Sequence, residues 1–168
     1  KAFKQFVEKH PGSRLTIAGG GPEELRLRQL IHKFGLENKV ELLGPIPRNQ
    51  LMDRMASSDV LLFPSLRDGG GTVVIEAMSA ARPVICLDAG GPGLHIIESC
   101  GIKVVPLSPA ETVVGLANAL ERLYLDGDLR ERMGQAGRER ARESYHWDKL
   151  GDRLNEIYQP IISPEICV

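Results

Sequence analysis

Hydrophobic residues gather in five short runs, and the stretches between them carry apolar positions at helical spacing. The runs are rich in Leu, Val and Ile, are bounded by Gly, Pro or Asp, and cover residues 15–18, 40–43, 60–63, 84–87 and 103–105. Such runs are typical of buried parallel strands. Helical patterns begin within the first three residues and continue at 22–34, 48–57, 72–81 and 92–99. This alternation predicts an α/β fold of right-handed βαβ units in a doubly wound parallel sheet.

The last third of the chain shows no further strand pattern. Helical patterns cover residues 108–124, 129–143 and 147–158, which predicts additional C-terminal helices packed against or beyond the sheet. No internal repeat, low-complexity segment or Gly/Ser linker divides the sequence. We therefore expect one domain over residues 1–162 and a disordered tail over 163–168. Because the sequence starts without Met and inside a helical pattern, we expect it to be a fragment of a longer protein.

Composition narrows the class of partner. Lys and Arg number 21 against 22 Asp and Glu, so nothing in the charge balance favours nucleic acid. Cys86, Cys100 and Cys167 form no CxxC pair and indicate reduced thiols. No apolar stretch approaches the roughly 18 residues of a membrane helix, and no secretory pattern is present. We expect a soluble, cytoplasmic protein in which nothing indicates membrane association.

Ligands of an open parallel sheet bind outside the carboxyl ends of its strands, so the loops after the strands are the candidate site. The first predicted strand is followed by three glycines, Gly19, Gly20 and Gly21. They suit a phosphate or sugar that approaches the backbone closely, and equally a tight turn. The second is followed by a proline-stiffened segment, Gly44, Pro45 and Ile46. It suits a platform for a planar base, and equally an ordinary rigid connection.

The loop after the third predicted strand gives the strongest indication of a ligand. Its last four residues, Gly69, Gly70, Gly71 and Thr72, present backbone N–H groups at the start of a helix, where the macrodipole also favours an anion such as a diphosphate. Glu76 stands alone among apolar residues of that helix, and an unpaired buried carboxylate is costly. We favour ribose hydroxyls as its donors over the alternative of a first-turn glutamate complementing the helix dipole.

Other chemistries find little support in the sequence. The four histidines, His10, His32, His95 and His146, show no metal-ligand spacing, and there is no HExxH, GxSxG or P-loop motif. His95 is the one near the flexible loop 88–93, but a lone histidine on a helix is more often structural, and we assign it no catalysis. We expect no metal and no cofactor.

Taken together, four segments resemble a known family: residues 17–22, 42–44 with Leu51, 56–64 and 64–83. They resemble the C-terminal, donor-binding half of the GT-B glycosyltransferases, in the retaining group called family 4 or group 1. The similarity runs over residues 15–158. Asp68 and Glu76 stand at the spacing of that family's EX7E motif, two acidic residues separated by seven others.

The resemblance implies a Rossmann-like half of a GT-B fold and a role for each site residue. Glu76 holds the nucleotide ribose and Asp68 faces the donor sugar, and these two are the implied catalytic pair. The diphosphate and sugar are lined by the loop residues around them, Ser65, Gly69, Gly70, Gly71, Thr72 and Val73. The segment Gly44–Ile46 holds the base of a UDP or GDP donor.

The chain also departs from the family pattern. Asp68 stands where the family usually has Glu, Gly70 where it has an aromatic residue, Ala81 where it has a helix-ending Gly, and Leu94 where it commonly has Glu. The family's diphosphate-binding Arg and Lys, and its acceptor-binding N-terminal domain, belong ahead of Lys1.

By resemblance, the full-length protein transfers a sugar from a nucleotide-sugar donor to an acceptor, with retention and without a metal, while this fragment alone is inactive. The acceptor reaches it through the N-terminal domain. The alternatives are a non-catalytic nucleotide-binding module, because the loop is looser, and a sugar-nucleotide epimerase.

Overall fold

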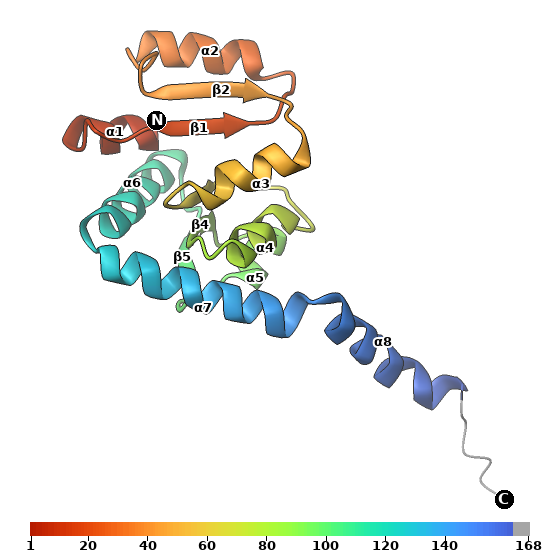
Figure 1. The fold of residues 1–168 in the computed structure, drawn as a ribbon. Helices are drawn as coiled ribbons and strands as arrows, with labels where there is room; N and C mark the ends of the chain where they lie inside the picture. Colours follow the sequence, from red (N-terminus) through yellow and green to blue (C-terminus); the bar gives the residue numbers. More distant parts are fainter. Residues whose placement is uncertain (163–168) are drawn as a thin grey trace, which may run out of the picture.

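The computed structural model describes residues 1–162, so the predicted tail 163–168 lies outside the described residues. Helices and strands alternate through residue 104, and helices follow (Figure 1). In chain order the elements are α1 Ala2–Lys9, β1 Leu15–Ala18, α2 Glu24–Lys33, β2 Val40–Gly44, α3 Arg48–Ala56, β3 Leu61–Phe63, α4 Thr72–Ser79, β4 Val84–Leu87, α5 Gly90–His95, β5 Gly101–Val104, α6 Pro109–Leu125, α7 Gly127–Tyr145 and α8 Trp147–Ile162. The α/β class and the additional C-terminal helices are confirmed.

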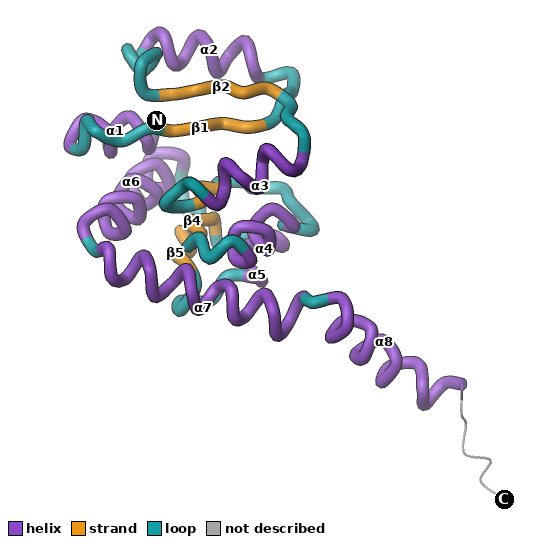
Figure 2. The backbone as a smooth tube through the Cα atoms, viewed as in Figure 1, coloured by secondary structure: helices purple, strands orange, loops and turns teal. Residues whose placement is uncertain are grey.

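All strand pairs are parallel, but they form two hydrogen-bonded groups instead of one sheet. β1 pairs with β2 (Figure 2). A second sheet has the order β3-β4-β5. Among residues 1–162, no strand pairs with β1 on the side away from β2, or with β3 on the side away from β4. The predicted parallel pairing is confirmed, and within the described residues the strands divide into these two groups because β1 and β3 exchange no backbone hydrogen bonds.

The helix before β5 differs most from its predicted bounds. α5 covers Gly90–His95, whereas the pattern predicted residues 92–99. It ends at His95 because Ile96 takes an extended conformation, with φ −86° and ψ 130°, and its side chain is buried in the core. An apolar residue that must reach the core outweighs the helical spacing of its neighbours.

The central strand β4 separates two apolar cores. Val84 and Cys86 face one cluster, which includes residues of α4 and α7. Ile85 and Leu87 face the other, which includes residues of α6. This alternation is the period of a strand buried on both faces. Burial also raises the pKa of the Cys86 thiol to about 11. A thiol this protonated at neutral pH is a weak nucleophile, so Cys86 serves packing.

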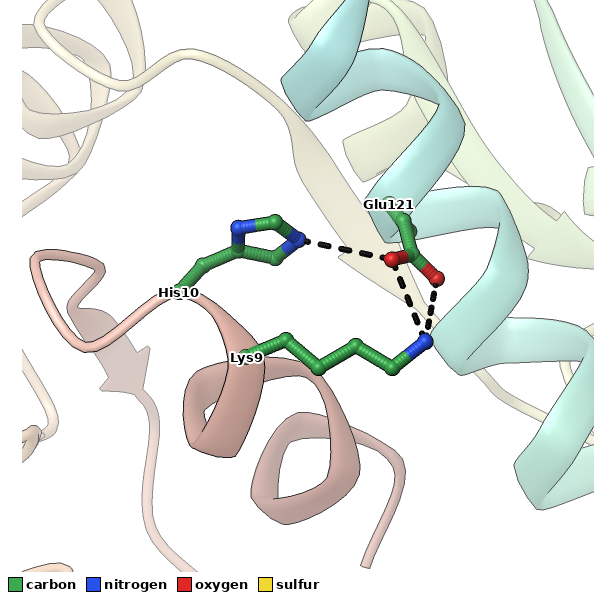
Figure 3. A network of polar contacts seen from close by, with 3 residues as sticks. All are labelled: Lys9, His10 and Glu121. Atoms are coloured by element: carbon green, nitrogen blue, oxygen red, sulfur yellow. Dashed lines mark hydrogen bonds and ion pairs between the residues drawn. The ribbon is translucent and has the colours of Figure 1, made fainter.

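The sheet of β1 and β2 packs with α1 and α2 around a third cluster of Phe3, Phe6, Val7 and Leu36. Polar contacts join α1 to α6 beside it (Figure 3). Lys9 Nζ donates to Glu121 Oε2 at 2.8 Å, and His10 Nε2 lies 3.6 Å from Glu121 Oε1. The hydrogen bond from Lys9 lowers the pKa of the Glu121 carboxyl. α1 is thereby anchored to the helices that cover the second sheet.

α7 crosses the three-stranded sheet and packs closely on α4. A Cβ at Gly134 would lie 2.2 Å from the Ala81 carbonyl oxygen, and one at Gly137 would lie 3.5 Å from Met78 Cγ, so α7 approaches α4 where it carries glycine. α8 continues from α7 and points away from the sheets (Figure 1). Within residues 1–162, no helix is both long and apolar enough to cross a membrane.

α4 ends in a Schellman motif that lacks the usual glycine. The Arg82 N–H donates to the Ala77 carbonyl and the Ala81 N–H to the Met78 carbonyl, both at 2.9 Å. Ala81 has φ 56° and is the one non-glycine residue with positive φ among those described. Ala81 thus takes the left-handed conformation at the position where the family usually has a helix-ending Gly, and its strain is the cost of closing α4 with alanine.

Replacing Ala81 with Gly should stabilise the protein. Glycine removes the left-handed strain but gains entropy in the unfolded chain, so we expect a net gain of about 0.5–1 kcal/mol. Chemical denaturation measures the free energy of unfolding. The matched control is Ala80→Gly: Ala80 has φ −81°, so its replacement should lower the stability. Equal effects of the two replacements would contradict the assigned strain.

Candidate functional site

The loops after β1 and β2 lie against each other. The Gly19 N–H donates to the Gly44 carbonyl at 2.8 Å, and a Cβ at Gly20 would lie 3.2 Å from Pro45 Cγ. Gly19 and Gly44 have φ 115° and 65°. Each loop thus contains a glycine in the positive-φ conformation that a tight turn requires. The roles predicted for Gly19, Gly20, Gly21, Gly44, Pro45 and Ile46 in donor binding stay predictions, and the structure brings these residues into one surface region.

The loop after β3 is joined to α5. The Gly91 N–H donates to the Asp68 carbonyl at 2.9 Å, and a Cβ at Gly91 would lie 2.5 Å from the Gly69 carbonyl oxygen. Gly71, at the N-cap of α4, is buried and has φ 60°. Both positions accept only glycine without rearrangement, one because the backbones are in contact and the other because of its left-handed conformation. Ser65 lies partly buried at the start of this loop.

Asp68 folds back onto its own loop. Its Oδ1 accepts hydrogen bonds from the Gly70 N–H at 3.0 Å and from the Gly71 N–H at 2.6 Å. Aspartate is well suited to such local turns, because its short side chain reaches backbone donors two or three residues ahead. This corrects one expectation: the N–H groups of Gly70 and Gly71 are not free but already bind a carboxylate. The contact of Asp68 with a donor sugar stays a prediction, for which the Oδ1 oxygen is already engaged in this structure.

The start of α4 retains unpaired donors. No side chain caps the helix, and among residues 1–162 the backbone N–H groups of Thr72 and Val73 have no hydrogen-bond acceptor. First-turn N–H groups carry the partial positive charge of the helix dipole. The anion-binding end of the predicted site therefore consists of Thr72 and Val73 beside the Asp68-capped loop.

Glu76 lies one turn into α4, on a helix whose Val74, Ala77 and Met78 are fully buried. Its side chain is 21% exposed, and Oε1 lies 2.8 Å from Arg48 Nη2. The alternative of a first-turn glutamate is excluded, because the first turn of α4 contains no acidic residue. Arg48 is 78% exposed, so this ion pair contributes at most about 1 kcal/mol. A ligand with stronger donors can share or replace it.

The ion pair connects the two regions of the site. Arg48 opens α3 directly after the loop of β2, whereas Glu76 follows the loop of β3. Sequence reasoning missed Arg48, although its place just after the predicted base-binding loop could have drawn attention to it. It also left aside His95, whose ring Nε2 lies 2.8 Å from the Gly70 carbonyl oxygen.

A third basic residue holds the loop after β4. Lys103 Nζ lies 2.9 Å from Asp88 Oδ1 and donates to the Gly93 carbonyl at 3.2 Å. Within the described part of the chain, no group of three or more His, Cys, Asp and Glu side chains is arranged to hold a metal ion.

Comparisons with known proteins identify relatives of this arrangement. The model of the family "Glycosyl transferases group 1" matches residues 1–140. The chain is similar to the alpha-D-kanosaminyltransferase of Streptomyces kanamyceticus, with 31% identity over 96% of this chain and 41% of that protein. Its structure is similar to sucrose-phosphate synthase from Thermosynechococcus elongatus, with TM-score 0.81 and 25% identity over 96% of this chain and 41% of that one.

A second solved structure carries ligands. HepE from Anabaena, in complex with UDP and glucose, has TM-score 0.80 and 23% identity, over 93% of this chain and 42% of that one. This likeness shows the fold. The chain spans about two fifths of the length of each of these three proteins.

Replacing Asp68 with Ala should loosen the loop before α4. The Gly70 and Gly71 N–H groups would lose their acceptor, which should lower the free energy of unfolding by about 1 kcal/mol and speed amide exchange at Gly71. Asn keeps an acceptor oxygen at the same atom, so Asp68→Asn should retain most of the protection. Hydrogen exchange followed by NMR measures both. Unchanged amide exchange at Gly71 in the alanine variant would show that the hydrogen bonds from Gly70 and Gly71 to Asp68 do not stabilise the loop.

Proposed function

Because this chain belongs to the group 1 glycosyl transferases, we propose that the protein containing it transfers a sugar from a nucleoside diphosphate donor to an acceptor, with this chain holding the donor. The observation that carries the proposal is the placement of Glu76. It is a largely buried carboxylate, and its one ionic partner among residues 1–162 is an exposed arginine. Ribose hydroxyls are donors of the right kind for its oxygens.

We place the diphosphate of the donor at the start of α4. The N–H groups of Thr72 and Val73 lie one turn before Glu76 on the same helix, as the diphosphate follows the ribose in the donor. In the transfer, the bond between the anomeric carbon and the diphosphate breaks, the acceptor oxygen bonds to that carbon, and the acceptor proton is released. Fixed N–H dipoles aimed at the departing diphosphate stabilise its growing charge without a metal.

The loops beside Arg48 are the proposed place of the base. Gly44, Pro45 and Ile46 lie next to the residue that contacts Glu76, which suits a base joined to the ribose. UDP and GDP donors are both compatible with this backbone platform, and the UDP seen in HepE favours testing UDP first. Retention at the anomeric carbon, and an acceptor delivered by an N-terminal domain, belong to the proposal through the family.

One observation favours a second function, that of a nucleotide-binding module without turnover. One oxygen of Asp68, Oδ1, is engaged by the Gly70 and Gly71 N–H groups of its own loop and is therefore occupied before any sugar binds. The two functions separate in one assay of the full-length protein with UDP- and GDP-sugars. A transferase releases the nucleoside diphosphate in step with glycosylated acceptor, whereas a binding module does neither.

Replacing Glu76 with Gln should weaken donor binding strongly. A neutral amide is a poorer acceptor for two hydroxyls and presents its own donor to them, so we expect the affinity for the nucleoside diphosphate to fall about 30-fold or more. Calorimetric titration of the full-length protein with UDP and GDP measures this. Glu131→Gln, on the exposed surface of α7, is the matched control and should bind like the parent. Equal binding by both variants would refute the ribose contact.

Replacing Arg48 with Ala should have a much smaller effect than replacing Glu76. The arginine is exposed and the ion pair is weak, so its loss should change the affinity for the nucleoside diphosphate less than about fivefold in either direction. The same titration provides the measurement. If the Arg48 variant bound the nucleoside diphosphate as poorly as the Glu76 variant, donor binding would depend on the intact Arg48–Glu76 ion pair and not on the Glu76 carboxylate alone.

A further inference from the structure

The loop before α4 has no side chains of its own to pack at its two exposed glycines. Gly69 and Gly70 are exposed, and a Cβ at either would meet no atom within 4 Å. Consecutive glycines lose more conformational entropy on ordering than any other residues. The backbone of Gly69 and Gly70 contacts Gly91 of α5, and in the described structure the one side chain from outside the loop that forms a hydrogen bond with this segment is His95.

His95 makes two directed contacts. Its Nε2 lies 2.8 Å from the Gly70 carbonyl oxygen, and its Nδ1 lies 3.0 Å from the Tyr145 hydroxyl. A carbonyl only accepts, so Nε2 carries the hydrogen, and in the tautomer with that single hydrogen Nδ1 accepts from the Tyr145 hydroxyl. Tyr145 thus selects the tautomer that donates to the loop. The two rings meet edge to face, with centroids 5.1 Å apart and an interplanar angle of 88°.

The histidine is held from α7 on its backbone side as well. Arg140 Nε donates to the His95 carbonyl at 3.0 Å, and its guanidinium lies 5.9 Å from the centre of the Tyr145 ring. α5 is short and contains three glycines, so it has little rigidity of its own. α7, by contrast, is 19 residues long and packs on α4. Helix α7 therefore contacts both α4 and His95.

The contact with Gly70 sets the direction of the next N–H group. The Gly70 carbonyl and the Gly71 N–H belong to one trans peptide unit and point in opposite directions. His95 holds the carbonyl, and the Gly71 N–H points to Asp68 Oδ1 at 2.6 Å. An acceptor that replaces the Asp68 carboxylate would meet a peptide that is already oriented.

We propose that His95, oriented by Tyr145, is a positioning residue that holds the Gly70–Gly71 peptide so that its N–H faces the diphosphate or sugar of the donor. This assignment rests on the proposed function for the identity of the ligand. His95 does not touch the donor. It lowers the entropy that the glycine loop would otherwise lose on binding.

Two substitutions of equal polarity provide a sharp test. In Gln, the amide nitrogen is as many bonds from Cα as Nε2 is in histidine, whereas in Asn it corresponds to Nδ1. His95→Gln should therefore keep the donor to Gly70, and His95→Asn and His95→Leu should lose it. In the full-length protein we expect UDP affinity, or GDP affinity if that is the donor, to fall about tenfold in the Asn and Leu variants and less than threefold in the Gln variant.

Two further readouts separate positioning from general destabilisation. Affinity for the corresponding monophosphate should change less than about threefold, because ribose and base contacts are untouched. Replacing Tyr145 with Phe should weaken diphosphate binding in the parent, because the hydroxyl that orients the His95 ring is lost. The same replacement should have no effect in the His95→Gln variant, because a glutamine amide has no tautomers for Tyr145 to select. Equal losses for mono- and diphosphate, or no rescue by Gln, would overturn the assignment.

The ligand-free loop tests the same contact if the proposed function fails. Should the parent bind neither UDP nor GDP, amide exchange at Gly71 still reports on its peptide. Exchange should be faster in His95→Leu and His95→Asn than in the parent, and close to the parent in His95→Gln. Identical exchange in all four proteins would refute the positioning role independently of any donor.

Discussion

Helix α4 lies between the three-stranded sheet and α7, with Val74, Ala77 and Met78 withdrawn from solvent. A helix packed this tightly fixes the direction of every side chain and N–H group on its remaining open side. That side carries Glu76, and the start of the helix carries the N–H groups of Thr72 and Val73. The spacing between the Glu76 carboxylate and these N–H groups is therefore set by one rigid element, as the proposed preorganised donor site requires.

Rigidity ends at the Gly70–Gly71 peptide, where the chain has no side chain to pack. Hydrogen bonds hold both sides of this peptide unit, from His95 to the carbonyl and from the N–H to Asp68. The shorter Asp68 and the glycine at position 70 depart together from the family pattern. Their joint effect is a loop whose carboxylate caps its own backbone, and which a histidine on α5 holds from outside.

Much of this could be predicted from the sequence, because strands and helices here carry strong local patterns. β1 and β4 were predicted at their observed bounds. The buried setting of Glu76 followed from the apolar residues around it.

The rest depends on contacts between distant segments, which no local pattern encodes. Arg48 reaches Glu76 across 28 positions, and Tyr145 reaches His95 across 50. The inward turn of Asp68 depends on φ and ψ of three glycines, which glycine itself does not determine. The division into two sheets depends on which strands form backbone hydrogen bonds with one another, which is decided by the tertiary arrangement.

The most direct test of this account is a crystal structure of the full-length protein with a bound nucleoside diphosphate. We expect both ribose hydroxyls to lie within hydrogen-bond distance of Glu76, the diphosphate to contact the Thr72 and Val73 N–H groups, and His95 to remain hydrogen-bonded to the Gly70 carbonyl. A nucleotide bound elsewhere, with Glu76 still paired only to Arg48, would contradict it.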